Sequence, residues 1–301
     1  MVRQYLETYR FTSIARYFQL QEHSSTPVPG TATSLGAIPA GGAQSGDVAL
    51  TAVSVVVPCY NEEQSLAYLA KTLRSVVEAW DHLYRFSFVF VDDCSTDRTW
   101  ELLQGLFGAD PGCTLLRHSR NLGVAAAIRT GLHAAKADIV CSMDCDCTYD
   151  PHELGEMIPL LTDDVDVVTA SPYHPMGKVK NVPQWRLFLS KSLSRLYRMV
   201  LRQKLHTYTS CFRVYRRGAA IGIPVERGGF FGVTEMLGRL DLAGRRIVEY
   251  PTTLEARMLG RSKMKVVRTI AGHLGLMAHL LRLRLSGGAS VESHIPRPAH
   301  E

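Results

Sequence analysis

The sequence predicts an α/β protein in which a Rossmann-like, mostly parallel sheet is flanked by helices. The first observation behind this prediction is that short apolar, β-branched runs alternate with helical segments along residues 53–170. Strands that alternate with helices of about ten to fifteen residues form parallel sheets through right-handed crossovers. The second is that polar side chains gather after four of the runs, at the edge where a parallel sheet binds its ligands.

The expected elements follow one another in a regular order. Apolar runs predict strands at residues 53–57, 86–91, 113–117, 139–143 and 165–170. Helices are expected from Glu62 to about Trp80, after Ser95 or Thr96, at 124–135 and at 152–161. Acids in a first turn and Ser or Thr at a cap indicate these helix starts. No Gly-x-Gly-x-x-Gly follows the first strand, which argues against a dinucleotide site.

Composition suggests how the chain of 301 residues is divided. Residues 23–50 are mostly Gly, Ala, Pro, Ser and Thr and predict a flexible linker, because they cannot bury enough surface to become ordered. Before it, residues 1–22 form an N-terminal arm whose apolar spacing fits one amphipathic helix only roughly. After it we expect a globular domain at 51–255 that includes an amphipathic helix at 184–204, a basic amphipathic segment at 256–285 and a flexible tail at 286–301.

The net charge of +6 is unevenly distributed. Residues 178–204 and 257–284 carry many Lys and Arg and no acid, which predicts a polyanionic partner, either an anionic membrane surface or a nucleic acid. Nucleic acid is not expected, because no aromatic platforms are interleaved with the basic groups. Basic helices with an apolar stripe and aromatic anchors lie in the membrane interface. The alternative is that both helices pack their apolar faces on the sheet.

Cysteine usage and hydropathy predict a cytoplasmic protein that is either soluble or lying on a membrane; with the basic helices and the resemblance described below, we expect it to be peripheral on the inner face of the membrane. The seven cysteines are an odd count, which favours reduced thiols over a disulfide framework. Cys141, Cys145 and Cys147 with His152 match no standard zinc spacing. No apolar run reaches the ~18 residues that span a bilayer, and charges near the N-terminus argue against a signal peptide.

Two acids, Asp144 and Asp146, follow the apolar run at 139–143. Residues two apart in an extended segment share a face. Hard carboxylates of this kind suit Mg²⁺ or Mn²⁺, which complete their shells with substrate phosphate and water. The alternative is a solvated acidic turn. The other strand ends carry Tyr60-Asn61-Glu62, Asp92-Asp93 and Asn121. Four such clusters on one edge favour a nucleotide-phosphate and metal pocket over helix caps alone.

These motifs give the chain a resemblance to glycosyltransferase family 2, which has the GT-A fold. They are Pro58-Cys59-Tyr60-Asn61-Glu62-Glu63, Val91-Asp92-Asp93-Cys94-Ser95-Thr96-Asp97, Asn121-Leu122-Gly123 and Asp144-Cys145-Asp146. Residues 209–217 and 257–264 are similar to dolichyl-phosphate mannosyltransferases and polyprenyl-phosphate hexosyltransferases. The resemblance runs over about residues 53–285 and implies that 51–255 is a GT-A catalytic domain.

The resemblance implies an inverting, metal-dependent transfer of mannose or glucose at the cytoplasmic membrane face. The donor would be a nucleotide-diphosphate sugar, GDP-mannose or UDP-glucose, the acceptor polyprenyl or dolichyl phosphate, and the cofactor Mg²⁺ or Mn²⁺. The need for a small membrane-spanning partner stays open.

The motifs and the resemblance together assign roles to individual residues. The expected metal ligands are Asp144 and Asp146, and the catalytic candidates are Asp146, Glu235, Arg257 and Lys263. The donor-binding candidates are Pro58, Tyr60, Asn61, Glu62, Asp92, Asp93, Asn121 and Asp144. The acceptor-binding candidates are Arg186, Ser190, Ser210 and Arg213.

The chain departs from the family pattern at four positions. Pro172 stands where Arg is usual, Cys211 replaces Gly, Thr148 replaces a Gln after the Asp-x-Asp, and Met236 replaces an Asp that hydroxyl-using relatives keep as a base. The last change suggests an acceptor that needs no deprotonation. Two other functions stay open: a family 2 transferase that uses a sugar or polymer hydroxyl, and a non-catalytic nucleotide-sugar-binding scaffold.

Overall fold

The computed structural model describes residues 50–255 and 266–286 of the chain. The expected arm at 1–22, the linker as far as residue 49, Arg257, Lys263 and the tail beyond 286 lie outside the described residues.

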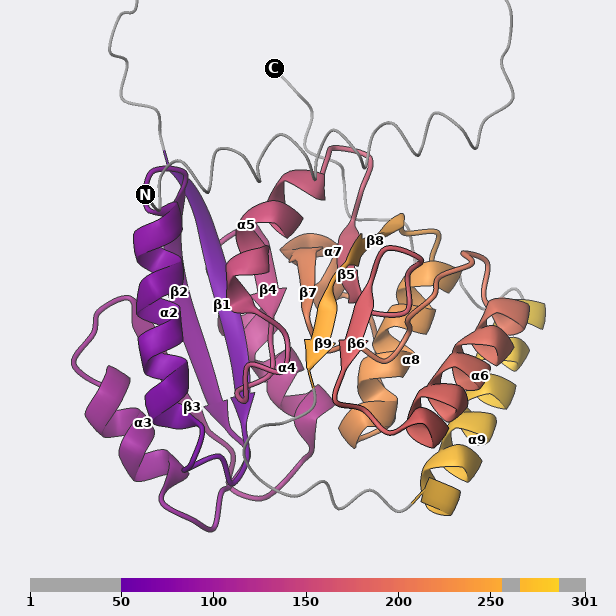
Figure 1. The fold of residues 1–301 in the computed structure, drawn as a ribbon, viewed down its shortest axis with the longest axis horizontal. Coiled ribbons are helices and arrows are strands. Elements are labelled where there is room, and N and C mark those ends of the chain that lie inside the picture. Colours follow the sequence, from indigo (N-terminus) through magenta and orange to yellow (C-terminus); the bar gives the residue numbers. More distant parts are fainter. Residues whose placement is uncertain (1–49, 256–265, 287–301) are drawn as a thin grey trace, which may run out of the picture. The chain divides into compact units, whose positions relative to one another are not determined.

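Seven strands of the described chain form one sheet, in the order β3-β2-β1-β4-β7-β5-β8 (Figure 1). Its neighbours pair in parallel, except that β7 runs antiparallel to both β4 and β5. The strands are β1 (Thr51–Cys59), β2 (Tyr84–Asp92), β3 (Cys113–Arg117), β4 (Ile139–Ser142), β5 (Val167–Ser171), β7 (Arg213–Arg216) and β8 (Ile247–Pro251). A short parallel pair is formed by β6 (Lys178–Lys180) and β9 (Thr253–Glu255).

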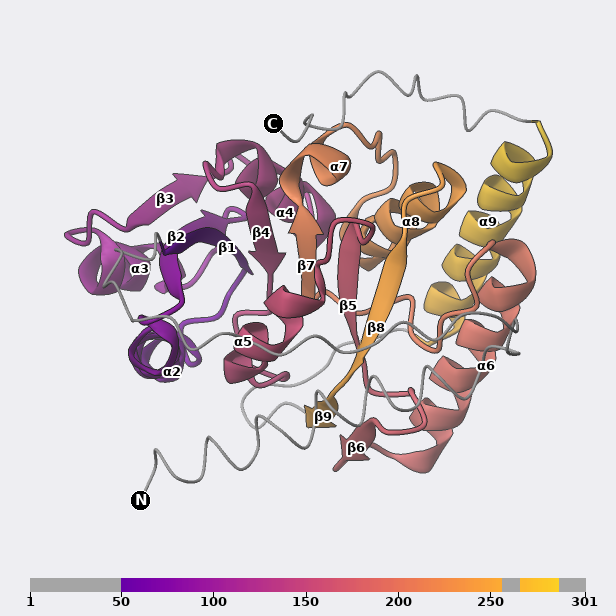
Figure 2. The ribbon, with the colours of Figure 1, turned by 90° about the horizontal axis from the view of Figure 1, so that it is seen from above.

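Helices cover both faces of the sheet (Figure 2). One face packs against α2 (Leu66–Trp80), α3 (Thr99–Phe107) and α5 (Leu154–Met157). The other packs against α4 (Val124–Ala134), α7 (Arg217–Ile221) and α8 (Gly229–Leu242). Beyond α8 lie α6 (Gln184–Val200) and α9 (Val266–Leu285). None of the described helices is long and apolar enough to cross a membrane.

The apolar runs of the sequence become strands because both faces of the sheet are buried. In β1, Val53, Val55 and Val57 enter one core and Val56 enters the other, each with no exposed surface. Burying such a side chain is worth roughly 1.5–3 kcal/mol relative to leaving it in water. A continuous run of β-branched residues is therefore the pattern of a central strand in a parallel sheet. This confirms the predicted α/β class.

Four expected helix boundaries differ from the structure. The helix expected to be capped by Ser95 or Thr96 begins at Thr99, because Ser95 Oγ accepts the Asn61 backbone N–H and the Thr96 backbone N–H donates to Asn61 Oδ1. The first helix begins at Leu66 rather than Glu62, because the backbone N–H of Glu62 donates to Thr99 Oγ1 at 2.8 Å and draws the chain into a loop. The helix expected at 152–161 is instead α5 between the 3₁₀ turns Pro151–Glu153 and Ile158–Leu160. The helix expected to reach residue 204 ends at Val200, after which the backbone N–H groups of residues 202 and 203 donate to Asp241.

Candidate active site at the carboxyl edge of the sheet

A cavity of about 610 Å³ opens at the carboxyl edge of the sheet, beside the ends of β1 and β4 and the first turns of α4 and α8. Seven of the predicted donor-binding residues line it. They are Pro58, Tyr60, Asn61, Glu62, Asp93, Asn121 and Asp144. Ligands of open α/β sheets bind at this edge, since the parallel strands end there together.

The loop after β1 is fixed by hydrogen bonds to the loop after β2. Asn61 adopts a positive φ of 55°, and its side-chain Oδ1 accepts a hydrogen bond from the Thr96 backbone N–H at 2.8 Å. The Asn61 backbone N–H donates to Ser95 Oγ at 3.0 Å. Asn61 therefore shapes the wall, while the neighbouring Tyr60 keeps 45% of its surface exposed and is available to a ligand.

Asp93 lines the cavity and also holds the turn that begins α4. Its Oδ1 accepts the Leu122 backbone N–H at 2.8 Å, and its Oδ2 accepts the Gly123 backbone N–H at 2.7 Å. His118 Nδ1 lies 2.8 Å from Oδ1. Asp93 is only 2% exposed, and both of its carboxylate oxygens accept hydrogen bonds from the protein. It therefore fixes the position of the Asn121–Gly123 turn.

Asp92, also predicted to bind the donor, does not reach the cavity. It has no exposed surface, and its Oδ2 lies 2.9 Å from Arg117 Nε in an ion pair. The Ser95 backbone N–H donates to the same carboxylate at 3.3 Å. The structure thus places the predicted donor-binding Asp92 inside the β2–α3 connection, where Arg117 neutralises its charge.

The two predicted metal ligands lie just beyond the end of β4. Cys145 between them is buried in the core, and residues 145–146 form a turn in which the Cys147 backbone N–H donates to the Asp144 carbonyl at 3.4 Å, so the segment does not have the extended conformation predicted from the sequence. Asp144 lines the cavity. Asp146 Oδ1 accepts hydrogen bonds from the backbone N–H and the hydroxyl of Thr148, at 3.1 and 2.6 Å.

The charges on the cavity wall fit a divalent cation. Within the described chain, the lining includes Glu62, Glu63, Asp93, Asp97 and Asp144 and no Lys or Arg. A diphosphate could bind beside these carboxylates only if a cation bound with it and offset the repulsion between the negative charges. Oxygen ligands from carboxylates are the donor set that Mg²⁺ and Mn²⁺ prefer, and Mg²⁺ is typically held by one or two carboxylates together with substrate phosphates.

The predicted acceptor-binding residues differ in exposure: Arg186 and Ser190 are partly exposed, whereas Ser210 and Arg213 are buried. Ser190 lies on α6, and the Ser210 Oγ accepts the Phe212 backbone N–H at 3.1 Å. Arg186, in the first turn of α6, lies over the Trp185 ring at 5.3 Å, and its Nε is buried without a hydrogen-bond partner among the described residues.

The structure places Arg213, which was predicted to bind the acceptor, in the core. The residue is completely buried, and its guanidinium donates to the carbonyls of Val233 and Tyr208 at 3.0 and 2.9 Å. It joins β7 to α8 and presents no surface to a ligand.

With this geometry established, the chain can be compared with known proteins. The model of the family described as "Glycosyl transferase family 2" matches residues 54–223. This chain belongs to glycosyl transferase family 2.

Two relatives and one solved structure illustrate the similarity. The dolichol-phosphate mannosyltransferase of Pyrococcus furiosus is 30% identical over 233 residues, which are 77% of this chain and 63% of that protein, less than two thirds of its length. The undecaprenyl-phosphate mannosyltransferase of Micrococcus luteus is 31% identical over 219 residues, 70% of this chain and 87% of that protein. A mannosyltransferase from Pyrobaculum calidifontis, solved with GDP-Man and Mn²⁺, has a TM-score of 0.57 at 20% identity and covers 82% of this chain and 70% of its own. That likeness confirms the predicted GT-A-like fold.

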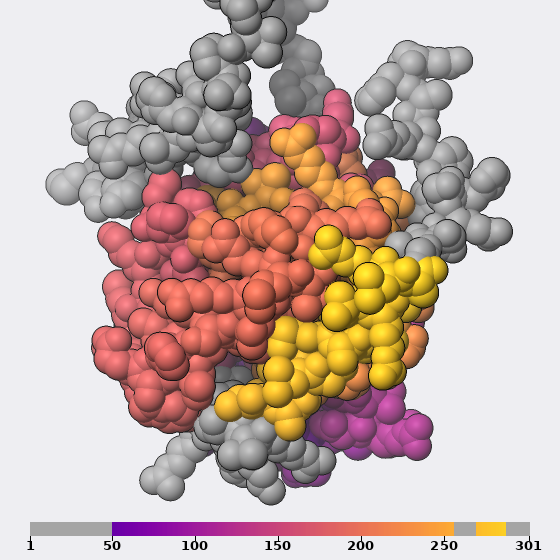
Figure 3. All heavy atoms as spheres, turned by 90° about the vertical axis from the view of Figure 1, so that its right-hand side faces the viewer, coloured from indigo at the N-terminus to yellow at the C-terminus, as the bar shows by residue number. Residues whose placement is uncertain are grey.

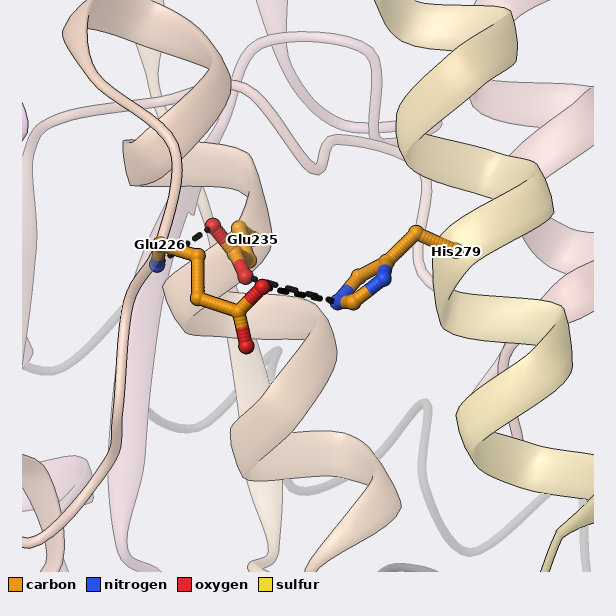
Figure 4. Close-up of side chains that lie close together, drawn as sticks. All are labelled: Glu226, Glu235 and His279. Carbon is orange, nitrogen blue, oxygen red and sulfur yellow. Dashed lines mark hydrogen bonds and ion pairs between the residues drawn. The ribbon is translucent and has the colours of Figure 1, made fainter.

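In this family 2 protein, Glu235 does not lie on the cavity wall as its predicted catalytic role would require. It is fully buried on α8, where Oε2 accepts the backbone N–H groups of Glu226 and Arg227 at 3.1 and 2.8 Å. Arg239 Nε donates to Oε1 at 2.8 Å, and His279 of α9 approaches Oε1 to 3.8 Å (Figure 4). Glu235 is thus the buried centre of an ion cluster that joins α8 to α9, and its contacts indicate a structural role in place of the predicted catalytic one.

Several cavity residues of the family 2 protein were not predicted from the sequence. Asp97 was expected only as an acid in the first turn of the helix that follows it. In the structure it lines the cavity and accepts the Glu63 backbone N–H at 3.3 Å. Gly229 and Phe230 bring the start of α8 to the wall. The tandem Gly228-Gly229 before an apolar run was a signal for this close approach: a Cβ on Gly123 would stand 2.6 Å from the Gly229 nitrogen.

Proposed function

We propose that this family 2 protein transfers a hexose from a nucleotide-diphosphate sugar to a polyprenyl phosphate, with inversion, at the cytoplasmic face of a membrane. The observation that carries the proposal is the acid-rich cavity at the strand ends, with Asp144 on its wall and Asp146 two residues further along the chain, in the turn that follows. Relatives named as dolichol-phosphate and undecaprenyl-phosphate mannosyltransferases support this class of acceptor.

The chemistry is a single displacement at the anomeric carbon. A phosphate oxygen of the lipid forms the new bond to that carbon while the bond from the carbon to the diphosphate oxygen breaks, and the electron pair leaves with the diphosphate. A lipid phosphate is already anionic at neutral pH and needs no general base. The burial of Glu235 away from the cavity agrees with such an acceptor.

Stabilising the leaving diphosphate is the main task of the site. A divalent cation held by Asp144 and Asp146 would supply the positive charge for this. The chain itself orients the donor. Tyr60 offers a half-exposed ring to the nucleotide, and Asp93 fixes the turn at Gly123 so that the N-terminus of α4 faces the cavity. Helix N-termini favour anions there, typically by 0.3–1 kcal/mol each.

The side of the protein formed by α6 and α9 supports a membrane partner. The two helices lie next to each other on one face (Figure 3). Large apolar side chains stay exposed there, among them Phe188 (66%) and Met199 (68%) on α6 and Leu285 (77%) on α9. Exposed basic residues such as Lys191 and Arg282 lie on the same helices. Apolar side chains beside cations suit an interface with anionic lipid.

The test is transfer by the purified full-length chain, with polyprenyl phosphate in vesicles that contain anionic lipid and with Mn²⁺ or Mg²⁺. Radiolabelled GDP-mannose and UDP-glucose are supplied in separate reactions. We expect label in a product that enters organic solvent and is released by mild acid. Asp146→Ala should reduce the rate by at least about a hundredfold, given the charge stabilisation lost. Asp163→Ala is the matched control, because that carboxylate is 88% exposed and does not belong to the Asp144–Asp146 segment.

Other outcomes would favour the alternatives. Label that stays in the aqueous phase on a sugar or polymer would indicate a hydroxyl acceptor. Metal-dependent donor binding without turnover would indicate a scaffold. Equal rates for Asp146→Ala and the unmodified chain would contradict the proposed metal site.

A further inference from the structure

The ends of β2 and β3 bring two consecutive pairs of side chains together on opposite faces of the sheet. In the parallel pairing of these strands Asp92 lies beside Arg117, and the His118 backbone N–H donates to the Asp92 carbonyl at 2.9 Å. Successive residues of a strand point to opposite faces. Asp92 meets Arg117 in the ion pair described above. Asp93 therefore meets His118 on the other face, which α4 covers.

The imidazole ring of His118 lies between Asp93 and α4. Its Nδ1 is 2.8 Å from Asp93 Oδ1, its Nε2 is 3.0 Å from Thr130 Oγ1, and the side chain is 9% exposed. A carboxylate only accepts hydrogen bonds, so Nδ1 carries the proton in this contact. In the neutral ring Nε2 then accepts from the Thr130 hydroxyl, and the partner of the second nitrogen selects the tautomer. The ring is thus held at both nitrogens.

The Asp93 carboxylate in turn holds the wall of the cavity. It accepts the backbone N–H groups of Leu122 and Gly123 at 2.8 and 2.7 Å. Gly123 has a φ of 89°, and a Cβ there would stand 2.6 Å from the Gly229 nitrogen, so this turn also abuts the first turn of α8. Asn121, Gly123 and Gly229 all line the cavity. A displacement of Asp93 would therefore move the wall at the point where α4 and α8 begin.

We propose that His118 is a positioning residue for the nucleotide-sugar donor. Its Nδ1–H holds the Asp93 carboxylate, and the carboxylate holds the Asn121–Gly123 turn and the first turn of α4 against the donor. The inference rests on the proposed function, because it takes the cavity to be the donor site. Hydrogen bonds to charged groups are the stronger ones, and the loss of one typically corresponds to a factor of about ten or more in an equilibrium constant.

The experiment measures the binding of GDP and of UDP to the full chain by isothermal titration calorimetry, in the presence of Mn²⁺. His118→Leu fills the space without a donor and should raise the dissociation constant of the bound nucleotide by about tenfold. His118→Asn, whose amide nitrogen falls near Nδ1, should remain within about threefold of the unmodified chain. The matched control is His133→Leu, because His133 is an exposed histidine in the last turn of α4, at the end away from the cavity. It should bind nucleotide as the unmodified chain does.

Transfer kinetics and a double-mutant cycle separate positioning from stability. His118→Leu should raise the KM for the nucleotide sugar and leave kcat and the KM for polyprenyl phosphate unchanged. Thr130→Val should weaken nucleotide binding by about threefold on its own. In the His118→Leu background it should add nothing, because it acts through the ring.

Three results would overturn the inference: an unchanged dissociation constant in His118→Leu, additive losses in the cycle, or losses that only follow the melting temperatures. Should His118→Leu not fold, His118→Gln, whose amide falls near Nε2 rather than Nδ1, must show the same loss. If the unmodified chain binds GDP or UDP and transfers hexose, a negative result at His118 leaves the proposed function standing. If it binds neither nucleotide, both fail.

Discussion

Replacing Glu235 by Gln tests whether this buried acid is structural, as its contacts indicate. The change preserves shape and leaves one carbonyl oxygen for the backbone N–H groups of Glu226 and Arg227. It places an amide NH₂ group, or a neutral oxygen, opposite the Arg239 guanidinium, which is 11% exposed and now 2.8 Å from Oε1. Breaking a buried ion pair typically costs about 3–5 kcal/mol. Because Arg239 keeps the 2.6 Å bond to Glu226 Oε1, we expect a loss of about 2–4 kcal/mol in the free energy of unfolding.

The assay is urea unfolding followed by tryptophan fluorescence, with transfer activity measured below the unfolding transition. Glu226→Gln is the matched control: its carboxylate binds the same Arg239 but is 65% exposed, so the loss should stay within about 1 kcal/mol. Adding Arg239→Gln to Glu235→Gln should recover part of the loss, because it removes the uncompensated charge. An unchanged urea midpoint for Glu235→Gln, combined with abolished turnover, would refute the structural role and restore the catalytic one.

Two further predictions concern packing and pH. Gly155→Ala should destabilise the protein by about 1–3 kcal/mol, because the new Cβ would stand 2.0 Å from the Trp80 ring; Gly105→Ala, with nothing within 4 Å, should instead raise the urea midpoint slightly. His273 is buried against Tyr197, whose hydroxyl lies 2.9 Å from Nδ1, and burial lowers the pKa of His273 to about 4. Below a pH of about 6.5 the unfolded chain binds a proton at this histidine, whereas the folded chain does not. The free energy of unfolding therefore decreases as the pH is lowered, by about 2 kcal/mol from this residue at pH 5. In His273→Gln that part of the difference between pH 7.5 and pH 5 unfolding should disappear, and an identical pH dependence would contradict the assignment.

The sequence was a good guide where local pattern and burial agree. The apolar run before Asp144 and the valines of β1 indicate central strands, because burial on both faces leaves no place for polar residues. The polar groups that follow them share one edge for a purely topological reason, which is why most predicted donor-binding residues do line the cavity.

The sequence was a poor guide where a distant partner determines the role of a charge. Asp92 and Arg213 are buried and are satisfied by Arg117 of β3 and by the Val233 carbonyl of α8. Glu235 is buried too; it pairs with Arg239 one turn along α8 and accepts backbone N–H groups of the preceding loop. Composition and spacing cannot distinguish a buried, compensated charge from one aimed at a ligand. β7 was not predicted from the sequence, because its four residues begin and end with Arg and show no apolar alternation.

The antiparallel direction of β7 restricts how this enzyme could be re-engineered by segment exchange. Ser142 of β4 lies opposite Arg213, so a single residue gained or lost inside β7 would move the side chains of that strand to the other face of the sheet, because a strand alternates with a period of two. A graft from another transferase that replaces β7 must therefore match the parent strand in length, or differ by pairs, if Arg213 is to keep its hydrogen bond to the Val233 carbonyl of α8. Register, more than residue identity, would decide whether such chimaeras retain the buried link between β7 and α8.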